Sequence, residues 1–421
     1  MSAYLLSMQS IENNKLAKNT LFLYIRMFLT MGISLYTSRV VLNVLGVNDY
    51  GIYNVVGGFV FLFGFINNSM TSATQRFLTV ELGKKGDVNT VFSTSVSIHI
   101  VIALIILVLC ESIGIWFLYN QMQMPSERLN AAFWTFQCSI LSTCVMIVSV
   151  PYNAVIIAYE KMSAFAYIAS LEVFLKLVIA FIISFQPYDN LIAYAVLMLV
   201  VQIIVRFCYS LYCNKHFPNI KFSFRLNMQL TKKMISFAGW TLSGNLAMMG
   251  YTQGLNILLN VFFGPIVNAA RGIAVQVQNA VIAFCSNFMV AVKPQIVKSY
   301  SQGNLHRLHK LVITSSKFSF YLLLCITLPL IFSINSILQI WLGNVPQNTN
   351  IFLIIILCSS MIRSLADPLI TSIHATGDIR KFQLVESSLL ICILPVSYVI
   401  LLFHFPPYSV FIIHLIFEVL T

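Results

Sequence analysis

The sequence predicts an all-α polytopic membrane protein, with about 12 transmembrane helices in two six-helix pseudo-repeat lobes around a central cavity. Composition gives the class: 58% of the 421 residues are hydrophobic and 9% are charged, whereas soluble domains carry about 25% charged residues. The mean hydropathy is +0.85. Two further observations, the length of the apolar runs and an internal repeat, give the architecture.

The apolar runs have the length of membrane spans. A bilayer core about 30 Å thick needs roughly 20 apolar residues per helix, and the alternating pattern of a membrane β-barrel is absent from the sequence. Helices are then the structure that satisfies the backbone in lipid. We expect spans at 20–43, 51–73, 90–119, 128–158, 162–185, 190–212, 233–261, 268–291, 311–334, 349–373, 380–403 and, shorter or truncated, 405–421.

The basic residues predict the orientation. Only Arg128 and Arg271 fall in the odd-numbered loops, which indicates that the N-terminus and the even-numbered loops are cytoplasmic. Residues 1–19 are polar and the first apolar run is too long for a cleavable signal, so we expect it to stay in the membrane. The even side holds Lys15, Lys18, Arg76, Lys84, Lys85, Lys161, Lys215, Lys221, Arg225, Lys232, Lys233, Lys293, Lys298, Arg307, Lys310, Arg380 and Lys381.

A spacing of 217 residues relates the two halves of the chain. Glycine, asparagine and proline recur at this spacing in the same places relative to the predicted spans, as parallel repeats do in transporters. We therefore expect an N-lobe at 1–212, a basic cytoplasmic linker at 213–233 and a C-lobe at 234–421. The matched positions are Asn43 and Asn260, Gly86-Asp87 and Gly303-Asn304, Pro151 and Pro368, Ala158 and Ala375, and Phe165 and Phe382.

Several function classes find no support in the residues. Most of the nine cysteines lie in apolar runs without a C-x-x-C pair, and the seven histidines have no metal-binding spacing. We expect no metal and no cofactor beyond a coupling ion, H⁺ or Na⁺. The net charge of +12 points to anionic lipid and topology, and not to nucleic acid.

Four motifs carry a family resemblance that spans nearly the whole chain. They are "NTLFLYIRMFLTMGISLYTSRVVLNVLGVNDYGIYNVVGG" (19–58), "ATQRFLTVELGKKGD" (73–87), "PYNAVIIAYEKM" (151–162) and "ATGDIRKF" (375–382). They resemble Wzx-type O-antigen and capsule polysaccharide flippases of the MOP superfamily, which also contains the MATE drug exporters.

The resemblance implies a flippase and not an enzyme. It would move a lipid-linked, undecaprenyl-pyrophosphate-type oligosaccharide across the bacterial inner membrane by alternating access, for lipopolysaccharide or other surface polysaccharide. A polysaccharide polymerase and a chain-length regulator are the protein partners that such a role suggests. We expect the transporter itself to be a monomer.

The first predicted helix has a polar face. Arg26 lies about 10 Å into the span at 1.5 Å per residue, and Arg26, Thr30 and Thr37 fall within about 40° of one another. This face either lines a water-filled cavity or makes a helix contact through small hydroxyl residues. Arg39, near the end of the same span, either extends this polar wall or reaches the headgroups.

The predicted helices at 233–261 and 268–291 carry the matching polar residues. Asn245 and Asn256 share a stripe with two threonines, and Arg271 opens the next helix one face away from Gln278. We expect these side chains to form a second polar wall of the cavity. Arginine suits a pyrophosphate because its planar fork matches phosphate oxygens.

Other charges within the spans have structural explanations of equal weight. Lys176 lies four residues from Glu172, and Arg363 four from Asp367, so each pair can form on one helix face. We count Lys176 and Arg363 among the candidate substrate residues. Arg206 and Lys317 lie near span ends, where long side chains snorkel to the headgroups.

Two other functions remain as alternatives. A cation-coupled multidrug exporter of the MATE type needs an acid in the cavity, and the first, second, seventh and eighth spans contain none, although Asp367 or Glu386 could serve. A membrane enzyme needs catalytic acids near a large loop, and the longest loops of about 20 residues hold no acid cluster.

Overall fold

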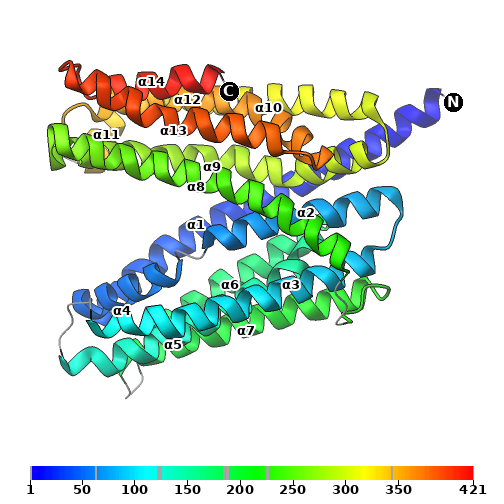
Figure 1. Cartoon of the computed structure of the whole chain (residues 1–421), viewed down its shortest axis with the longest axis horizontal. Coiled ribbons are helices and arrows are strands. Elements are labelled where there is room, and N and C mark those ends of the chain that lie inside the picture. Colours follow the sequence, from blue (N-terminus) through cyan, green and yellow to red (C-terminus); the bar gives the residue numbers. More distant parts are fainter. Residues whose placement is uncertain are drawn as a thin grey trace. The chain divides into compact units, whose positions relative to one another are not determined.

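A computed structural model describes residues 2–61, 64–120, 126–183, 185, 189–223, 227–342 and 345–420, and within these ranges the regular structure is entirely helical (Figure 1). A π-helical turn at Cys110–Gly114 joins α3 to α4. The helices are α1 Ser2–Phe61, α2 Gly64–Lys84, α3 Val88–Leu109, α4 Ile115–Asn120, α5 Leu129–Ala158, α6 Met162–Ile182, α7 Asn190–His216, α8 Met228–Phe263, α9 Pro265–Ser301, α10 Leu305–Phe332, α11 Ile334–Leu342, α12 Thr349–Thr376, α13 Arg380–Leu402 and α14 Ser409–Leu420.

The helices confirm the predicted class of a multi-pass α-helical membrane protein. Nine helical segments of the described chain are long and apolar enough to cross a membrane. The first two predicted spans fall on α1 and α2, and the last corresponds to α14, which is 12 residues long. Helices α7 and α8 extend into the predicted linker, so the segment between them is 217–227.

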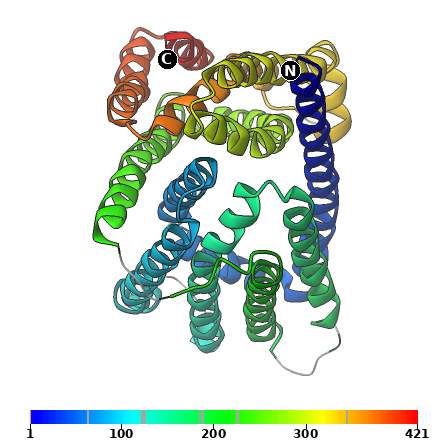
Figure 2. The same ribbon diagram turned by 90° about the vertical axis from the view of Figure 1, so that its right-hand side faces the viewer.

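The chain divides into two compact units, Met1–Ser236 and Phe237–Thr421, with the boundary inside α8. In the first unit, α5 packs against α1, α2, α3, α6 and α7, and its core includes Phe92, Phe136 and Ile140. In the second, α12 packs against α9, α10 and α14, and α13 lies beside α14 (Figure 2). The lobe limits predicted from the sequence, including the linker at 213–233, stay a prediction.

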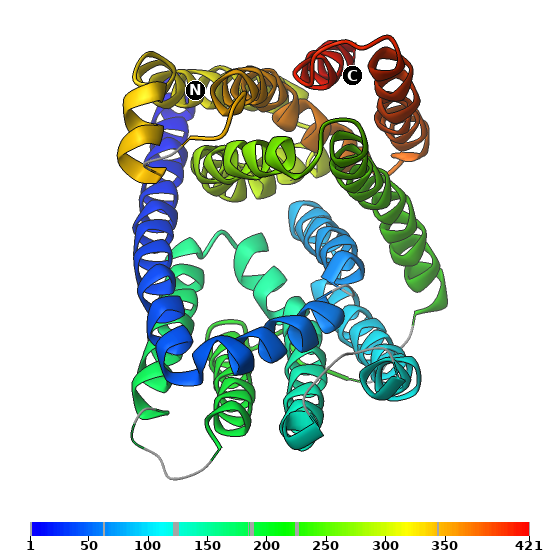
Figure 3. The same cartoon turned by 90° about the vertical axis from the view of Figure 1, so that its left-hand side faces the viewer.

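The same backbone bend occurs once in each unit. Gly46 inside α1 has φ 74° and ψ 169°, and Gly264 between α8 and α9 has φ 78° and ψ −173°. Side chains other than glycine rarely adopt this conformation. Figure 3 shows the sharp change of direction that the bend gives α1. The two glycines are 218 residues apart, one residue from the predicted spacing.

Two helix ends recur at the predicted spacing itself. Asp87 and Asn304 cap α3 and α10, each accepting a hydrogen bond of 3.1 Å from the backbone N–H three residues later. After α5 and α12, Glu160 and Gly377 take the left-handed conformation, with φ of 57° and 84°. These matches support two structural repeats, while the symmetry axis along the membrane normal stays a prediction.

An ionic clamp joins three segments at one end of the first unit. Arg128, just before α5, forms an ion pair and a 2.9 Å hydrogen bond with Asp49, which lies beyond the bend of α1. Its other branch lies 2.5 Å from Asp189, whose carboxylate also caps α7. At the opposite end of the unit, Asn19 donates to the carbonyl of Glu160. These contacts show that the first, third and fifth predicted loops lie at one end.

We expect Arg128→Ala to destabilise the first unit. The substitution leaves two carboxylates without their cation, and hydrogen bonds to charged groups contribute about 1.5–3 kcal/mol each. Thermal unfolding of the purified protein should show the loss. Lys84→Ala, which removes an exposed lysine, should change stability by less than about 0.5 kcal/mol. Equal stability of the two variants would show that the clamp contributes nothing.

Candidate functional site

Arg26 of α1 stacks on an aromatic ring of α6. Its guanidinium carbon lies 4.7 Å from the centroid of the Phe165 ring. Tyr209 of α7 lies within electrostatic range of the same guanidinium. Helix α1 packs closely along α6, so the cation is held among three helices. A cation over a ring face is stabilised by about 0.5–2 kcal/mol, depending on its desolvation.

Deeper in the same unit, α6 and α7 share a polar group of three side chains. Lys176 Nζ lies 2.6 Å from Glu172 Oε1, which confirms the pairing predicted from their spacing. Gln202 of α7 donates a 3.2 Å hydrogen bond to the same carboxylate oxygen. Tyr209 lies within electrostatic range of both Glu172 and Arg26. We call Arg26, Glu172, Lys176, Gln202 and Tyr209 the N-unit cluster.

Arg206 does not lie at the end of its helix as a free headgroup anchor. It lies ten residues before the last residue of α7, and its guanidinium carbon is 3.7 Å from the centroid of the Tyr152 ring on α5. The stack satisfies the cation inside the unit, where snorkelling was one of the predicted explanations.

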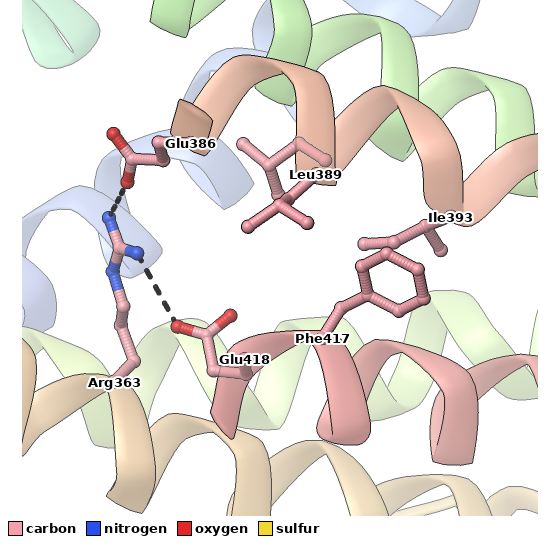
Figure 4. A pocket seen from close by; sticks show the side chains of 7 residues that line it. Arg363, Glu386, Leu389, Ile393, Phe417 and Glu418 are labelled. Atoms are coloured by element: carbon pink, nitrogen blue, oxygen red, sulfur yellow. Dashed lines mark hydrogen bonds and ion pairs between the residues drawn. The ribbon is translucent and has the colours of Figure 1, made fainter. Parts of the chain in front are cut away.

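The second unit contains an ionic cluster centred on Arg363 of α12 (Figure 4). Its guanidinium lies 2.8 Å from Glu386 of α13 and 3.5 Å from Glu418 of α14. The predicted partner on the same helix, Asp367, is present at 3.7 Å. Gln383 donates a 3.2 Å hydrogen bond to the second oxygen of Glu386. One arginine therefore holds three carboxylates from three helices.

A small pocket opens beside this cluster. It is lined on one side by Arg363, Glu386 and Glu418 and on the other by apolar side chains of α13 and α14, including Ile393 and Phe417 (Figure 4). Three carboxylates against one guanidinium give a formal excess of negative charge. The arrangement can accommodate a proton or another small cation.

A second chain of contacts leads from this cluster to the start of α9. His414 lies 3.5 Å from Glu418 and stacks on Tyr251, with ring centroids 5.0 Å apart. Arg271 lies within electrostatic range of both rings. Its guanidinium donates to the side chain of Asn256 and, at 3.0 Å, to the carbonyl of Thr252.

Arg271 is therefore a buried structural link between α8 and α9 as well as a candidate substrate residue. Its exposed fraction is 6%, and its bonds cross the bend at Gly264. We call Arg271, Arg363, Glu386, His414 and Glu418 the C-unit cluster. The two clusters lie in different units, and each is complete within its own.

The remaining predicted site residues have separate positions. Thr30 and Thr37 donate to the carbonyls of Met27 and Ile33 on their own helix. Gln278 donates a 2.9 Å hydrogen bond to Ser360 of α12, and Asn245 is half-buried on α8. The side chain of Arg39 lies outside the described part of the structure.

Sequence reasoning missed the partners that lie on other helices. Helical spacing identifies the pairs four residues apart, but it has no means of finding Glu386 or Glu418 for Arg363. The signal available was chemical: Gln202, Gln383 and His414 are polar residues inside apolar runs, where such groups generally mark internal contacts.

Comparison with known proteins adds information about the fold. No family model matches the sequence, and no curated protein matches it. Among solved structures, an outward-facing multidrug resistance MATE family transporter of the MOP superfamily matches with TM-score 0.79 and 12% identity, over 96% of this chain and 92% of that chain. A MATE protein in the straight conformation gives 0.79 and 13%, with the same coverage.

A third match is a MOP superfamily transporter from Pyrococcus furiosus, described as having a binding pocket of reverse polarity that suggests a different function. Its TM-score is 0.72 at 12% identity, over 95% of this chain and 92% of that chain. At these identities the likeness establishes the fold. The chain has the fold of the MATE transporters along nearly its whole length.

We expect Arg363→Ala to destabilise the second unit by about 3–5 kcal/mol, because removal of one partner leaves buried charges without compensation. Adding Glu386→Gln should restore part of the loss, since one of the stranded carboxylates is then neutral. A double-mutant cycle of thermal unfolding measures this coupling. Additive losses would show that Arg363 and Glu386 do not depend on each other.

Proposed function

We propose that the chain is a membrane transporter of the MOP superfamily and flips a lipid-linked oligosaccharide. The substrate carries an undecaprenyl-pyrophosphate-type anchor and crosses the bacterial inner membrane by alternating access. The fold supports the transporter class. The motifs at 19–58, 73–87, 151–162 and 375–382 support the polysaccharide subtype.

The observation that carries the substrate class is the positive charge of the first half. Its predicted spans hold four basic residues, Arg26, Arg39, Lys176 and Arg206, and two acids, Glu111 and Glu172. Exporters of cationic drugs need the opposite balance. A pyrophosphate needs cations, and a guanidinium meets phosphate oxygens with paired hydrogen bonds.

Arg26 is the basic residue best placed for this role. Stacking on Phe165 fixes the plane of its guanidinium, so less conformational freedom is lost when a phosphate binds. Lys176 lies deeper and carries Glu172 as a counter-anion at 2.6 Å. A pyrophosphate that approaches Lys176 would compete with this carboxylate, and the competition keeps binding reversible.

The setting of the proposed transporter follows from the charge distribution. The excess of basic residues in the even-numbered loops supports a cytoplasmic N-terminus in the inner membrane. Polysaccharide polymerase and chain-length regulator are proposed neighbours in the same process, and the functional unit is proposed to be a monomer. Catalytic chemistry has no role in this proposal.

One observation favours a second candidate, a cation-coupled exporter of the MATE type. Arg363 is surrounded by Asp367, Glu386 and Glu418, at 3.7, 2.8 and 3.5 Å. The excess of carboxylates suits a proton or sodium ion. The same cluster could also supply the coupling ion of a flippase, so the substrate decides between the two functions.

We expect Arg26→Ala to abolish most polysaccharide export while membrane insertion stays normal. Loss of a charge-assisted hydrogen bond costs on the order of 1.5–3 kcal/mol, or roughly 10- to 150-fold in affinity. Arg26→Lys keeps the charge but loses the paired geometry, so a partial defect should result. Complementation of a flippase-null strain measures both variants, with protein levels checked by blot.

The matched control is Arg76→Ala. Arg76 also stacks on a phenylalanine, with its guanidinium carbon 4.9 Å from the Phe77 centroid, but it lies outside the predicted spans. Export should be normal in this variant. Wild-type export by Arg26→Ala would contradict the proposed role of the N-unit cluster, and drug efflux lost with Glu386→Gln would favour the exporter.

A further inference from the structure

Lys317 is a cation on the outer face of a membrane helix. It lies twelve residues into α10, and its side chain is exposed. Within the described ranges it takes part in no ion pair, and α10 itself contains no acid. A lysine in the hydrocarbon region costs at least about 2.5 kcal/mol unless it reaches water or an anion.

The direction of the side chain indicates where that anion lies. Side chains of a helix lean toward its N-terminus, and the N-terminal end of α10 is its basic end. Lys310, which is also exposed, precedes Lys317 by seven residues, or about 10.5 Å of helix. A lysine stem spans about half that distance when it snorkels. The two ammonium groups therefore converge on one level at the membrane surface.

Hydrogen-bonding groups lie on the same face. Thr314 is exposed between the two lysines, and His306 lies one turn before Lys310. Residues 306, 310, 314 and 317 follow the i, i+4, i+8, i+11 spacing of a single helix face. The face thus offers two cations, a hydroxyl and an imidazole over two to three turns.

Farther along α10 this face becomes apolar. Ile313, Phe318, Tyr321 and Leu328 are exposed by 56%, 45%, 60% and 42%. An exposed apolar stripe on a membrane span faces hydrocarbon, where acyl chains lie. A ligand that fits the whole face has an anionic head beside Lys310 and Lys317 and apolar tails along the rest of the helix.

We propose that Lys310, Thr314 and Lys317 bind the phosphate of an anionic membrane phospholipid on the outer face of the second unit. Phosphatidylglycerol has the required head and tails. The site is separate from both clusters described above, and the proposal does not depend on the transported substrate.

The test compares lipids on the full-length protein. Wild-type protein in detergent should be stabilised against thermal unfolding more by phosphatidylglycerol than by phosphatidylcholine. In K310A/K317A the preference should disappear, because the two lysines together are expected to contribute roughly 10- to 30-fold in affinity for an anionic lipid. Lys317→Met with Lys310→Met keeps the apolar stems and serves if the alanine variant unfolds.

Lys381→Ala is the matched control, because Lys381 is an exposed lysine at the start of α13 in a loop predicted to lie on the same side. It should keep the preference for phosphatidylglycerol. Native mass spectrometry should show one retained phosphatidylglycerol fewer on the double variant. An unchanged preference in both double variants, or the same stabilisation of wild type by inorganic phosphate alone, would overturn the proposal.

Discussion

The cost of an unpaired charge in hydrocarbon is the constraint on which the polar interior of this protein depends. Each ionised group inside the described helices of the first unit is held by a specific neighbour: Arg26 by the Phe165 ring, Lys176 by Glu172 and Arg206 by the Tyr152 ring. These neighbours lie mostly on other helices, so the charges also fix how the helices pack. Their positions are then well defined, which a binding site requires.

The same constraint gives the two units different chemistry. The N-unit cluster contains two cations and one carboxylate, whereas Arg363 in the second unit faces three carboxylates. A transporter that binds an anionic group in one unit and a cation in the other could couple their movements, since each ligand changes the charge balance of its own unit. The bends at Gly46 and Gly264 give both units a point of articulation close to their polar residues.

The sequence predicted the helical membrane class, the span positions and the pairs four residues apart, because these depend on composition and helical period alone. It overestimated the polar face of α1: Thr30 and Thr37 bond to carbonyls of their own helix, as threonines in apolar helices commonly do. It also missed Glu386 and Glu418 around Arg363. These contacts depend on how α12, α13 and α14 pack, which residue spacing within one helix does not specify.

Transport in proteoliposomes tests the central claim most directly. A fluorescent oligosaccharide on a polyprenyl pyrophosphate is placed in the outer leaflet with the purified protein, and its movement is followed by protection from a membrane-impermeant quencher. The account predicts protection that requires the protein and that fails for the same glycan on a neutral polyprenol. Protection that is equal for the neutral lipid, or absent for both lipids while a cationic dye is transported, would contradict it.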